Sequence, residues 1–511
     1  MSNMRRPAAK THNVPAPVGG INARDAYTDM APEDAVGLTN VFPEASYLTV
    51  RGGYTAHATT DAAPVRSLMV WHGDTDFMFA GAGDTIWGVT NAGAGTTEVT
   101  GQTNVDYQWT NIQTSGGQFL LCVNGADKMN AYDGSAWTVP VITGVDSADF
   151  VNLCQFKERM WFATRDSLDL YYLGLQSIAG AATLFPLGSV VSKGGKVVGL
   201  GTFSRDAGDG PDDFFVIVTD NGQVVMYQGT DPNNAATWSL VGVFNCGKPI
   251  GRRSMVRLNG DLAIITQDGV VSAQALLQFD RASIQKASIT GKIQTLFSQY
   301  AQNYFNNFGW QPCVFPTARY LMVNIPVAPD QSQTQLVMNT ITGAWCQFTG
   351  MSGGCWANAE NSLYFGGNDG TVYQANNGYR DGGSPIPWDV RTSWQMVGGA
   401  TNKFYTMARP VMLIGGGVSY VIGVDVDFKT TPLSLNGALV SPGIGMVSPG
   451  IGMVWPWTWP GTWGGQAQLD SSWRSVGALG TWASVHIMGS VNGDRCQLNN
   501  IQVVSSTGGP L

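Results

Sequence analysis

One short pattern recurs through most of this chain and limits what it can fold into. Each copy is a run of aromatic or β-branched residues, a turn rich in Asp, Asn and Gly, and a second such run. Asp-Gly or Asn-Gly between alternating apolar residues indicates a β-hairpin, because the turn needs positive φ angles. The five clearest copies are "DFMFAGAGDTIWGV" (76–89), "GQFLLCVNGADKMNAYDGSAWTV" (117–139), "FFVIVTDNGQVVMYQG" (214–229), "DLAIITQDGVVSAQAL" (261–276) and "NSLYFGGNDGTVYQAN" (361–376). The pattern predicts an all-β protein.

The composition agrees with many short strands joined by tight turns. Only 13% of the 511 residues are charged, against roughly 25% in an ordinary soluble domain. The chain also contains 65 Gly, 17 Trp, 16 Tyr and 21 Phe. A chain of this length can bury a large core.

The spacing of the hairpins predicts a β-propeller. Two further stretches carry strands with weaker turn signals, at 153–174 and 318–350. About seven blocks then lie between residues 61 and 385, about 40 to 50 residues apart, which is the length of a four-stranded blade. We expect about seven blades, with six to eight left open.

One segment departs from the strand pattern. The stretch "SITGKIQTLFSQYAQNYFNNF" (288–308) has apolar residues at helical spacing and Thr290 as a candidate N-cap. The spaced residues are Ile293, Leu296, Phe297, Tyr300 and Tyr304. This helix either packs on the propeller wall or forms an interface with a neighbouring subunit.

Three domains are expected along the chain. Residues 1–60 form an N-terminal arm and a small β-element, residues 61–385 form the propeller with a helical insert near 281–308, and residues 386–511 form a C-terminal β-domain with a protruding loop at 436–465. The apolar stretch 408–424 is too short for a membrane helix and indicates two buried strands. The first residues lack the apolar core of a secretory signal, so synthesis and folding in a cytoplasm are expected.

The cysteines and histidines show no metal or catalytic motif. The seven cysteines are an odd number without a C-x-x-C pair, which favours reduced buried thiols over a disulfide framework or a metal site. The histidines do not fit a zinc motif, and no G-x-S-x-G motif is present. The four histidines are His12, His57, His72 and His486. The sequence therefore predicts neither an enzyme nor a cofactor.

Two acidic turns each match a known binding motif in part. The segment "RDAGDGPDD" (205–213) lacks the ligand spacing of an EF-hand, which favours a solvated loop over a calcium site. Its acidic residues are Asp206, Asp209, Asp212 and Asp213. The segment "AYDGSAW" (131–137) resembles the Asp-box turn of sialidases, although Ala131 replaces its Ser and the Asp-to-Trp spacing is one residue short.

An exact duplication lies near the C-terminus. Residues 440–453 read "VSPGIGMVSPGIGM", and Pro and Gly in each copy exclude a helix and disfavour a central strand. A protruding loop is predicted, followed by Trp residues that would share one side of an extended chain. The candidate tip residues are Pro442, Ile444, Met446, Pro449, Ile451, Met453, Trp455, Trp457, Trp459 and Trp463.

Several stretches together resemble the tail nozzle of short-tailed bacteriophages, also called tail tubular protein B. They are "GGINARDAYTDMAPEDAVGLTNVFPEASYLTVRGGY" (19–54), "VMNTITGAWCQFTGM" (337–351), "LYFGGNDGTVYQA" (363–375) and "IQVVSSTGGPL" (501–511). The resemblance implies a six-subunit ring below the tail adaptor and portal in the virion, with the genome leaving through a central channel. It also implies that tail fibres or receptor-binding proteins attach near the upper rim.

The charge is compatible with this expectation. A net charge of −8 and a pI near 5.0 do not suit a surface that grips phosphates, whereas an acidic lining repels DNA and lets it slide. In such a ring the tip loop would close the channel, touch the host envelope or another tail protein, or fold back on the C-terminal domain.

Two other functions stay open on the sequence. The first is a β-propeller glycan hydrolase or carbohydrate-binding protein, for which Trp-rich surfaces are equally natural. The second is a solitary propeller scaffold for cellular partners.

Overall fold

The computed structural model describes residues 9–206, 211–278, 288–435 and 468–507. Strands hold 55% of it and helices 6%, so the all-β prediction is confirmed. The chain divides into two compact units. Unit 1 comprises residues 1–55, 336–350 and 376–511, and unit 2 comprises residues 56–335 and 351–375.

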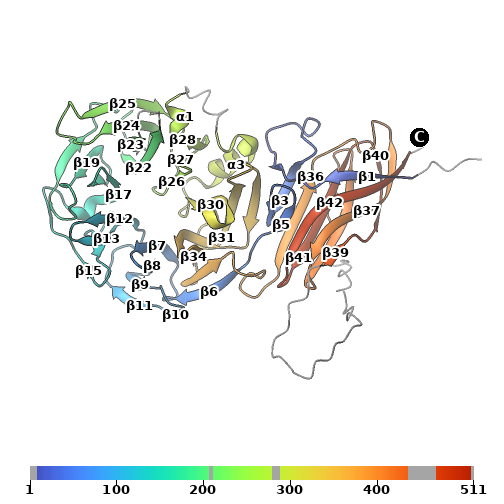
Figure 1. Ribbon diagram of the computed structural model, residues 1–511, viewed down its shortest axis with the longest axis horizontal. Helices are drawn as coiled ribbons and strands as arrows, with labels where there is room; N and C mark the ends of the chain where they lie inside the picture. Colours follow the sequence, from blue (N-terminus) through green and yellow to red (C-terminus); the bar gives the residue numbers. More distant parts are fainter. Residues whose placement is uncertain (1–8, 207–210, 279–287, 436–467, 508–511) are drawn as a thin grey trace, which may run out of the picture. The chain divides into compact units, whose positions relative to one another are not determined.

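Unit 2 is a succession of antiparallel sheets that follow one another around a ring (Figure 1). The first sheet holds β7 (Val65–His72), β8 (Asp76–Ala82), β9 (Thr85–Gly88) and β11 (Thr96–Val99). The second holds β12 (Gln108–Thr114), β13 (Gly117–Val123), β14 (Asn130–Tyr132) and β15 (Trp137–Thr138). The third holds β17 (Phe150–Phe156), β18 (Arg159–Thr164), β19 (Asp169–Tyr172) and β21 (Thr183–Pro186). The fourth holds β22 (Val197–Asp206), β23 (Pro211–Thr219), β24 (Gln223–Gly229) and β25 (Trp238–Asn245). The fifth holds β26 (Met255–Leu258), β27 (Asp261–Thr266) and β28 (Gly269–Ser272).

Two more sheets complete the series in unit 2. The sixth holds β29 (Gln311–Phe315), β30 (Tyr320–Ala328) and the first half of β31 (Ser332–Asn339). The seventh holds β33 (Gly353–Ala359), β34 (Ser362–Gly367), β35 (Thr371–Ala375), β6 (Tyr54–Thr59) and β10 (Gly93–Ala94). Strand β6 comes from the start of the unit and lies beside β35 from its end, so residues about 300 apart share one sheet. A small parallel pair, β16 (Ile142–Thr143) and β20 (Gly180–Ala181), stands outside the seven.

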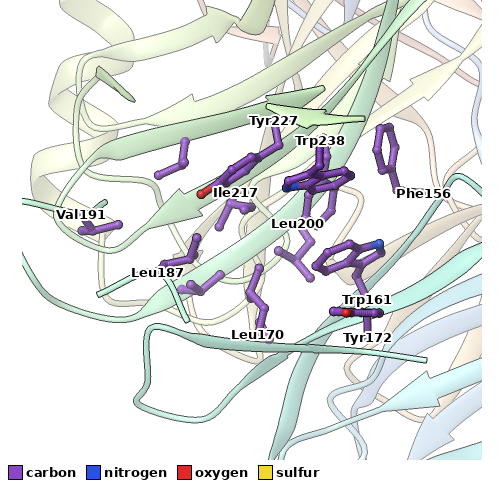
Figure 2. Close-up of a cluster of buried hydrophobic side chains, with 14 of the residues drawn as sticks. Phe156, Trp161, Leu170, Tyr172, Leu187, Val191, Leu200, Ile217, Tyr227 and Trp238 are labelled. Carbon is purple, nitrogen blue, oxygen red and sulfur yellow. The ribbon is translucent and has the colours of Figure 1, made fainter. Parts of the chain in front are cut away.

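Neighbouring sheets of unit 2 pack face to face through apolar side chains. Figure 2 shows the cluster between the third and fourth sheets, where Trp161 and Trp238 stack with ring centroids 5.5 Å apart. Trp161 is fully buried and Tyr172 lies 4.8 Å from it. Similar clusters join the seventh sheet to the first, the first to the second, the second to the third and the fourth to the fifth. Each of the first four sheets therefore packs apolar side chains on both of its faces.

The hairpin turns have the backbone that the sequence predicts. Gly222 in the Asn-Gly turn between β23 and β24 has φ 74°, and Gly134 in the Asp-Gly turn between β14 and β15 has φ 96°. The turn between β17 and β18 instead places Lys157 and Glu158 at φ 47° and 59°. Positive φ is costly for such side chains, which explains the weak turn signal in this stretch.

The predicted helix exists but begins later than expected. Helix α3 spans Gln294–Tyr304, and its inner face buries Phe297 and Ala301. A 3-10 turn, η2 (Gly291–Ile293), precedes it. Thr290 occupies the N-cap position of η2, as predicted, but its side chain makes no cap hydrogen bond, because its hydroxyl accepts a hydrogen bond from the amide of Val270. The other helices of the described ranges are short: α1 (Ala273–Leu276), η1 (Ser147–Asp149) and η3 (Pro316–Ala318).

Unit 1 is built from two groups of strands that come from distant parts of the chain. One sheet has the order β39-β37-β42-β5-β4, with β1 also paired to β42 and β40 to β37. Its strands are β1 (Lys10–Pro15), β4 (Val41–Pro43), β5 (Leu48–Val50), β37 (Lys403–Ile414), β39 (Gln468–Asp470), β40 (Arg474–Gly480) and β42 (Cys496–Thr507). The other group has the order β32-β3-β36-β41-β38, with β2 beside β3. Its strands are β2 (Gly20–Ile21), β3 (Asp34–Thr39), β32 (Trp345–Thr349), β36 (Ile386–Thr392), β38 (Val418–Val426) and β41 (Ala483–Val491).

The division into units differs from the expected order of three domains. Residues 10–55 belong to the same unit as residues 376–511, because β1 pairs with β42 along its whole length, from Lys10 opposite Ser505 to Pro15 opposite Asn500. Strand β32 of the expected propeller region also belongs to this unit. The two strands expected in 408–424 are present as β37 and β38.

All seven cysteines are free thiols in the structure, six of them buried and Cys154 half-buried. Burial raises the pKa of Cys154, Cys313, Cys355 and Cys496 to about 12, so these thiols stay protonated at neutral pH. Within the described ranges, no helix combines the length and apolar character that crossing a membrane requires.

Candidate functional site

The predicted tip residues, Pro442, Ile444, Met446, Pro449, Ile451, Met453, Trp455, Trp457, Trp459 and Trp463, lie outside the described residues. Their role therefore stays a prediction from the sequence. The candidate site in the described part of the chain is a pocket in unit 2, and its residues come from other stretches.

The pocket lies where the first strands of all seven sheets of unit 2 converge. Its volume is about 730 Å³. One lining side chain from each first strand, in chain order, is Leu68, Trp109, Leu153, Leu200, Val256, Phe315 and Ala357. All seven sheets therefore contribute to the wall of this pocket.

Two adjacent arginines, which share one aspartate as a partner, form one end of this pocket. Arg252 and Arg253 lie just before β26, and both reach the carboxylate of Asp106. The Nη2 atoms of Arg253 and Arg252 lie 2.6 Å and 3.4 Å from the Asp106 oxygens. Arg253 Nη2 also donates to the carbonyl oxygens of Arg66 and Tyr107, at 2.8 Å and 3.3 Å. These contacts hold the Arg253 guanidinium, whose side chain is 12% exposed, in one orientation.

A second cavity of about 380 Å³ lies on the other side of these arginines. Gln108, Arg252 and Arg253 line both cavities, whereas Asp106 and residues 305–310 line only the second. The residues that line both spaces stand between them. We call these three residues, together with Asp106, which binds both arginines, the arginine floor.

Acidic and imidazole groups lie on the first and seventh sheets around the same pocket. His72 Nδ1 lies 2.9 Å from Asp76 Oδ1, and Asp76 Oδ2 accepts a hydrogen bond of 2.9 Å from the Glu360 amide. His72, Asp76 and Glu360 all line the pocket. The pocket thus offers hydrogen-bond donors at the arginine floor and acceptors on the side of Asp76 and Glu360.

Other polar groups beside the pocket are held in neutral forms. Tyr107 is 1% exposed and donates to Gln102 Oε1 at 2.7 Å, and burial raises the pKa of its hydroxyl far above the ordinary value. Cys313 and Cys355 line the pocket, and burial keeps their thiols protonated. These three groups can donate hydrogen bonds but do not add charge.

A buried ion pair of unit 1, between Arg51 and Asp381, has a structural role. Arg51 is 1% exposed and binds both carboxylate oxygens of Asp381, with Nη1 at 2.8 Å and Nη2 at 2.5 Å. Its remaining donors reach Asn40 Oδ1 at 2.9 Å and the carbonyl oxygens of Gly52 and Thr349 at 2.9 Å and 2.6 Å. A guanidinium with every donor engaged fixes the fold and leaves none for a ligand.

The four histidines occupy separate places. His12 Nε2 lies 3.1 Å from Ser505 Oγ, and His57 Nε2 lies 3.0 Å from the Val89 carbonyl oxygen. His486 is 4% exposed, and its Nε2 lies 2.7 Å from Asp389 Oδ2. Among the described residues, no group of three or more His, Cys, Asp and Glu side chains is placed to hold a metal ion.

The two acidic turns have structural contacts. Asp133 in the turn that resembles an Asp-box accepts hydrogen bonds of 2.8 Å from the amides of Ser135 and Ala136 and from the Ser135 hydroxyl. These bonds, first that from Ala136, lower the pKa of Asp133. In the other turn, Asp213 binds Lys157 and Ser204, and the side chains of Asp206, Asp209 and Asp212 lie outside the described residues.

Sequence reasoning did not find the arginine floor. The usable signal was the pair Arg252-Arg253 in "GKPIGRRSM", because adjacent cations are unusual in a chain with only 28 basic residues. Their partner Asp106 lies 146 and 147 residues away, so no local pattern connects the three.

Comparisons with known proteins show no family for this chain. No family model matches it, and no curated protein matches it. Similar solved structures include the computationally designed Ika8 protein, at 12% identity and a TM-score of 0.34 over 63% of this chain and 99% of that one. The BBS1N protein in complex with ARL6DN matches at 9% identity and a TM-score of 0.39, over 64% and 98%. An exo-beta-1,3-galactanase from Phanerochaete chrysosporium matches at 14% identity and a TM-score of 0.28, over 77% and 95%.

Proposed function

We propose that unit 2 is a seven-bladed β-propeller. Seven successive sheets whose first strands line one pocket support this assignment. The pairing of β6 with β35 also supports it, because a strand from the start of a propeller commonly completes the last blade and holds the ring together.

We further propose that the chain is a structural virion protein, a subunit of the tail nozzle of a short-tailed bacteriophage. In this proposal six copies form a ring below the adaptor and portal, and tail fibres or receptor-binding proteins attach to it. The observation that carries the proposal is where the resembling stretches lie. Three of the four stretches, 19–54, 337–351 (apart from its last residue) and 501–511, belong to unit 1 although they are far apart in the sequence, whereas the fourth, 363–375, belongs to unit 2.

Direct contacts connect these stretches. Asn40 Nδ2 donates to Thr349 Oγ1 at 3.1 Å, and Arg51 Nη2 donates to the Thr349 carbonyl oxygen at 2.6 Å. Strand β42, which contains the start of the last stretch, pairs with β5 through Leu498 opposite Leu48. A resemblance of which three parts meet in one packed unit describes a shared architecture better than scattered coincidences would.

The DNA path in this proposal runs between subunits. A sphere of about 730 Å³ is about 11 Å across, less than the roughly 12 Å width of the major groove alone. The arginine floor also stands across the pocket. The conduit is therefore a channel enclosed by the ring of copies, and the propeller axis serves another purpose.

Light scattering on the purified chain, alone and mixed with its tail adaptor, tests the proposal. We expect a mass near six chains of 54.5 kDa in at least one of the two samples. A strict monomer that ignores the adaptor would contradict the nozzle.

The alternative function is a propeller that hydrolyses or binds a glycan. The observation that favours it is the pocket itself, which combines Trp109 with acceptors at Asp76 and Glu360. This alternative expects a monomer that acts on or binds a saccharide, so the same scattering experiment separates it from the nozzle.

A further inference from the structure

The arginine floor presents two donors with no assigned role in the fold. Arg253 Nη1 and Gln108 Nε2 are buried and have no hydrogen-bond partner among the described residues. Both side chains line the pocket. Buried donors are normally satisfied, so two of them at one end of a cavity indicate a place for acceptor atoms.

The geometry of Arg253 makes Nη1 a fixed donor. Its other terminal nitrogen is held by Asp106, at 2.6 Å, and by the Arg66 carbonyl oxygen, at 2.8 Å. The guanidinium also lies over the Phe308 ring, 5.4 Å from its centroid. A donor that is already oriented loses little freedom when a ligand binds.

The charge at the floor suits a single negative charge. Arg252 and Arg253 share one carboxylate, that of Asp106, which leaves one positive charge in excess. Arg257 also lines the pocket and adds a positive charge, whereas Asp76 and Glu360 add two negative charges that repel a dianion. A carboxylate with two acceptor oxygens therefore fits better than a doubly charged phosphate.

The walls of the pocket suit a hydroxylated ring. Trp109, Leu153 and Leu200 supply apolar surface, while Asp76 and Glu360 supply acceptors for hydroxyl groups. The volume of about 730 Å³ lies within the roughly 300–1,000 Å³ of small-molecule sites.

We propose that this pocket binds a sugar acid of the hexuronic acid class. Its carboxylate accepts hydrogen bonds from Arg253 Nη1 and Gln108 Nε2, and its hydroxyls face Asp76 and Glu360. The inference concerns unit 2 alone and does not depend on ring assembly. A nozzle with this site would carry a saccharide-binding function in each subunit.

Isothermal calorimetry on the full chain, with glucuronate as the probe, tests the proposal. We expect glucuronate to bind at least about ten-fold more tightly than glucose, because glucose offers a neutral hydroxyl in place of the carboxylate and accepts weaker hydrogen bonds from the two donors. Glucose 6-phosphate should also bind more weakly than glucuronate. Equal affinity for glucose, or no heat with millimolar glucuronate, would overturn the proposal.

Two variants locate the site. Gln108→Leu removes one donor with little change in volume and should weaken glucuronate binding about ten-fold while weakening glucose binding less. Arg253→Lys keeps the positive charge but removes Nη1, and should weaken glucuronate further. The matched control is Arg165→Gln, because Arg165 is exposed, pairs with Asp149 at 2.7 Å and does not line the pocket.

The other possible results also test the proposed binding site. If Arg253→Lys fails to fold, Gln108→Leu with an unchanged melting temperature still tests the site. Unchanged glucuronate affinity in a folded Gln108→Leu variant would reject the assigned contact. Tighter binding of a short peptide with one glutamate would reject a saccharide in favour of a protein segment. Because the readout is ligand affinity, failure here leaves the mass expected for the nozzle untouched.

Discussion

The two units of this chain are both built mainly from strands, but their sheets are assembled from different parts of the sequence. In unit 2 each sheet is made mostly from consecutive strands, such as β22 to β25 between residues 197 and 245. In unit 1 the central strand β42 pairs with β1, which precedes it by nearly 500 residues, and with β37 and β5. Local hairpins therefore specify unit 2, whereas long-range pairing specifies unit 1.

The forces that hold the units differ as well. Unit 2 repeats apolar clusters between neighbouring sheets, and the Trp161 cluster is one of several. Unit 1 includes the buried pair of Arg51 and Asp381, which connects its first segment to its last. Losing one methylene group from a repeated apolar layer should cost little, whereas losing one charge from a buried pair should cost much.

The largest effect is expected for Asp381→Leu. This change leaves the Arg51 charge buried without its partner and should lower the free energy of unfolding of unit 1 by about 3–5 kcal/mol. Native-state hydrogen exchange on β5 and β42 measures the loss, and β24 in unit 2 serves as the internal reference.

The matched control for that change is Asp149→Leu in unit 2. Its partner Arg165 is 55% exposed and Asp149 is 43% exposed, so the loss should be only about 0–1 kcal/mol. Comparable losses of unfolding free energy for the two variants would show that the buried pair of Arg51 and Asp381 stabilises the fold no more than the exposed pair of Arg165 and Asp149.

A smaller effect is expected for Ile217→Val in unit 2. Ile217 is fully buried in the cluster of Figure 2, and loss of one methylene group should cost about 0.5–1.5 kcal/mol. Hydrogen exchange should increase in the third and fourth sheets and stay unchanged in unit 1. Val241→Ala on the exposed edge of the fourth sheet is the control, and a loss from Ile217→Val as large as that from Asp381→Leu would erase the proposed contrast.

The smallest effect is expected from mild acid on unit 1. Burial, then Lys403 and Lys10, lower the pKa of His12 below 6.5, so the unfolded state binds its proton more readily. Stability is therefore complete above the unfolded pKa and falls as pH drops below about 6.5. Amides of β1 should exchange faster, after correction for intrinsic rates, at about pH 5.5 than at about pH 7.5.

The variant His12→Gln checks this assignment. In this variant the amide hydrogens of β1 should no longer exchange faster at the lower pH, while the amides of β24 in unit 2 stay protected in both proteins. Persistent acid sensitivity of β1 in the variant would assign the effect to another group.

The sequence predicted unit 2 more completely than unit 1. The turns at Gly134 and Gly222 have the positive φ that Asp-Gly and Asn-Gly imply, and the strands on either side are where the apolar runs place them. Helix α3 was expected, but its first turn is displaced by η2 and the Thr290 side chain binds Val270 instead of making a cap hydrogen bond. A cap depends on local geometry that a competing tertiary hydrogen bond can replace.

The site was predicted least well. Asp106 supports Arg253 across 147 residues of chain, and no periodicity or motif connects them. For the same reason, the sequence did not predict which strands the residues 10–55 pair with, because their partners lie near the other end of the chain. Sequence patterns report neighbours along the chain, and these contacts join residues that are far apart.

The sequence by itself determined the all-β class, the hairpins and the position of the one longer helix, because turn geometry and side-chain period are properties of short segments. Only the tertiary structure decided which strands share a unit, where the first strands of unit 2 converge and which arginine is left with a free donor. These outcomes depend on charged side chains and strand edges that pair with residues far away in the sequence. Such pairs form only when the whole chain packs together.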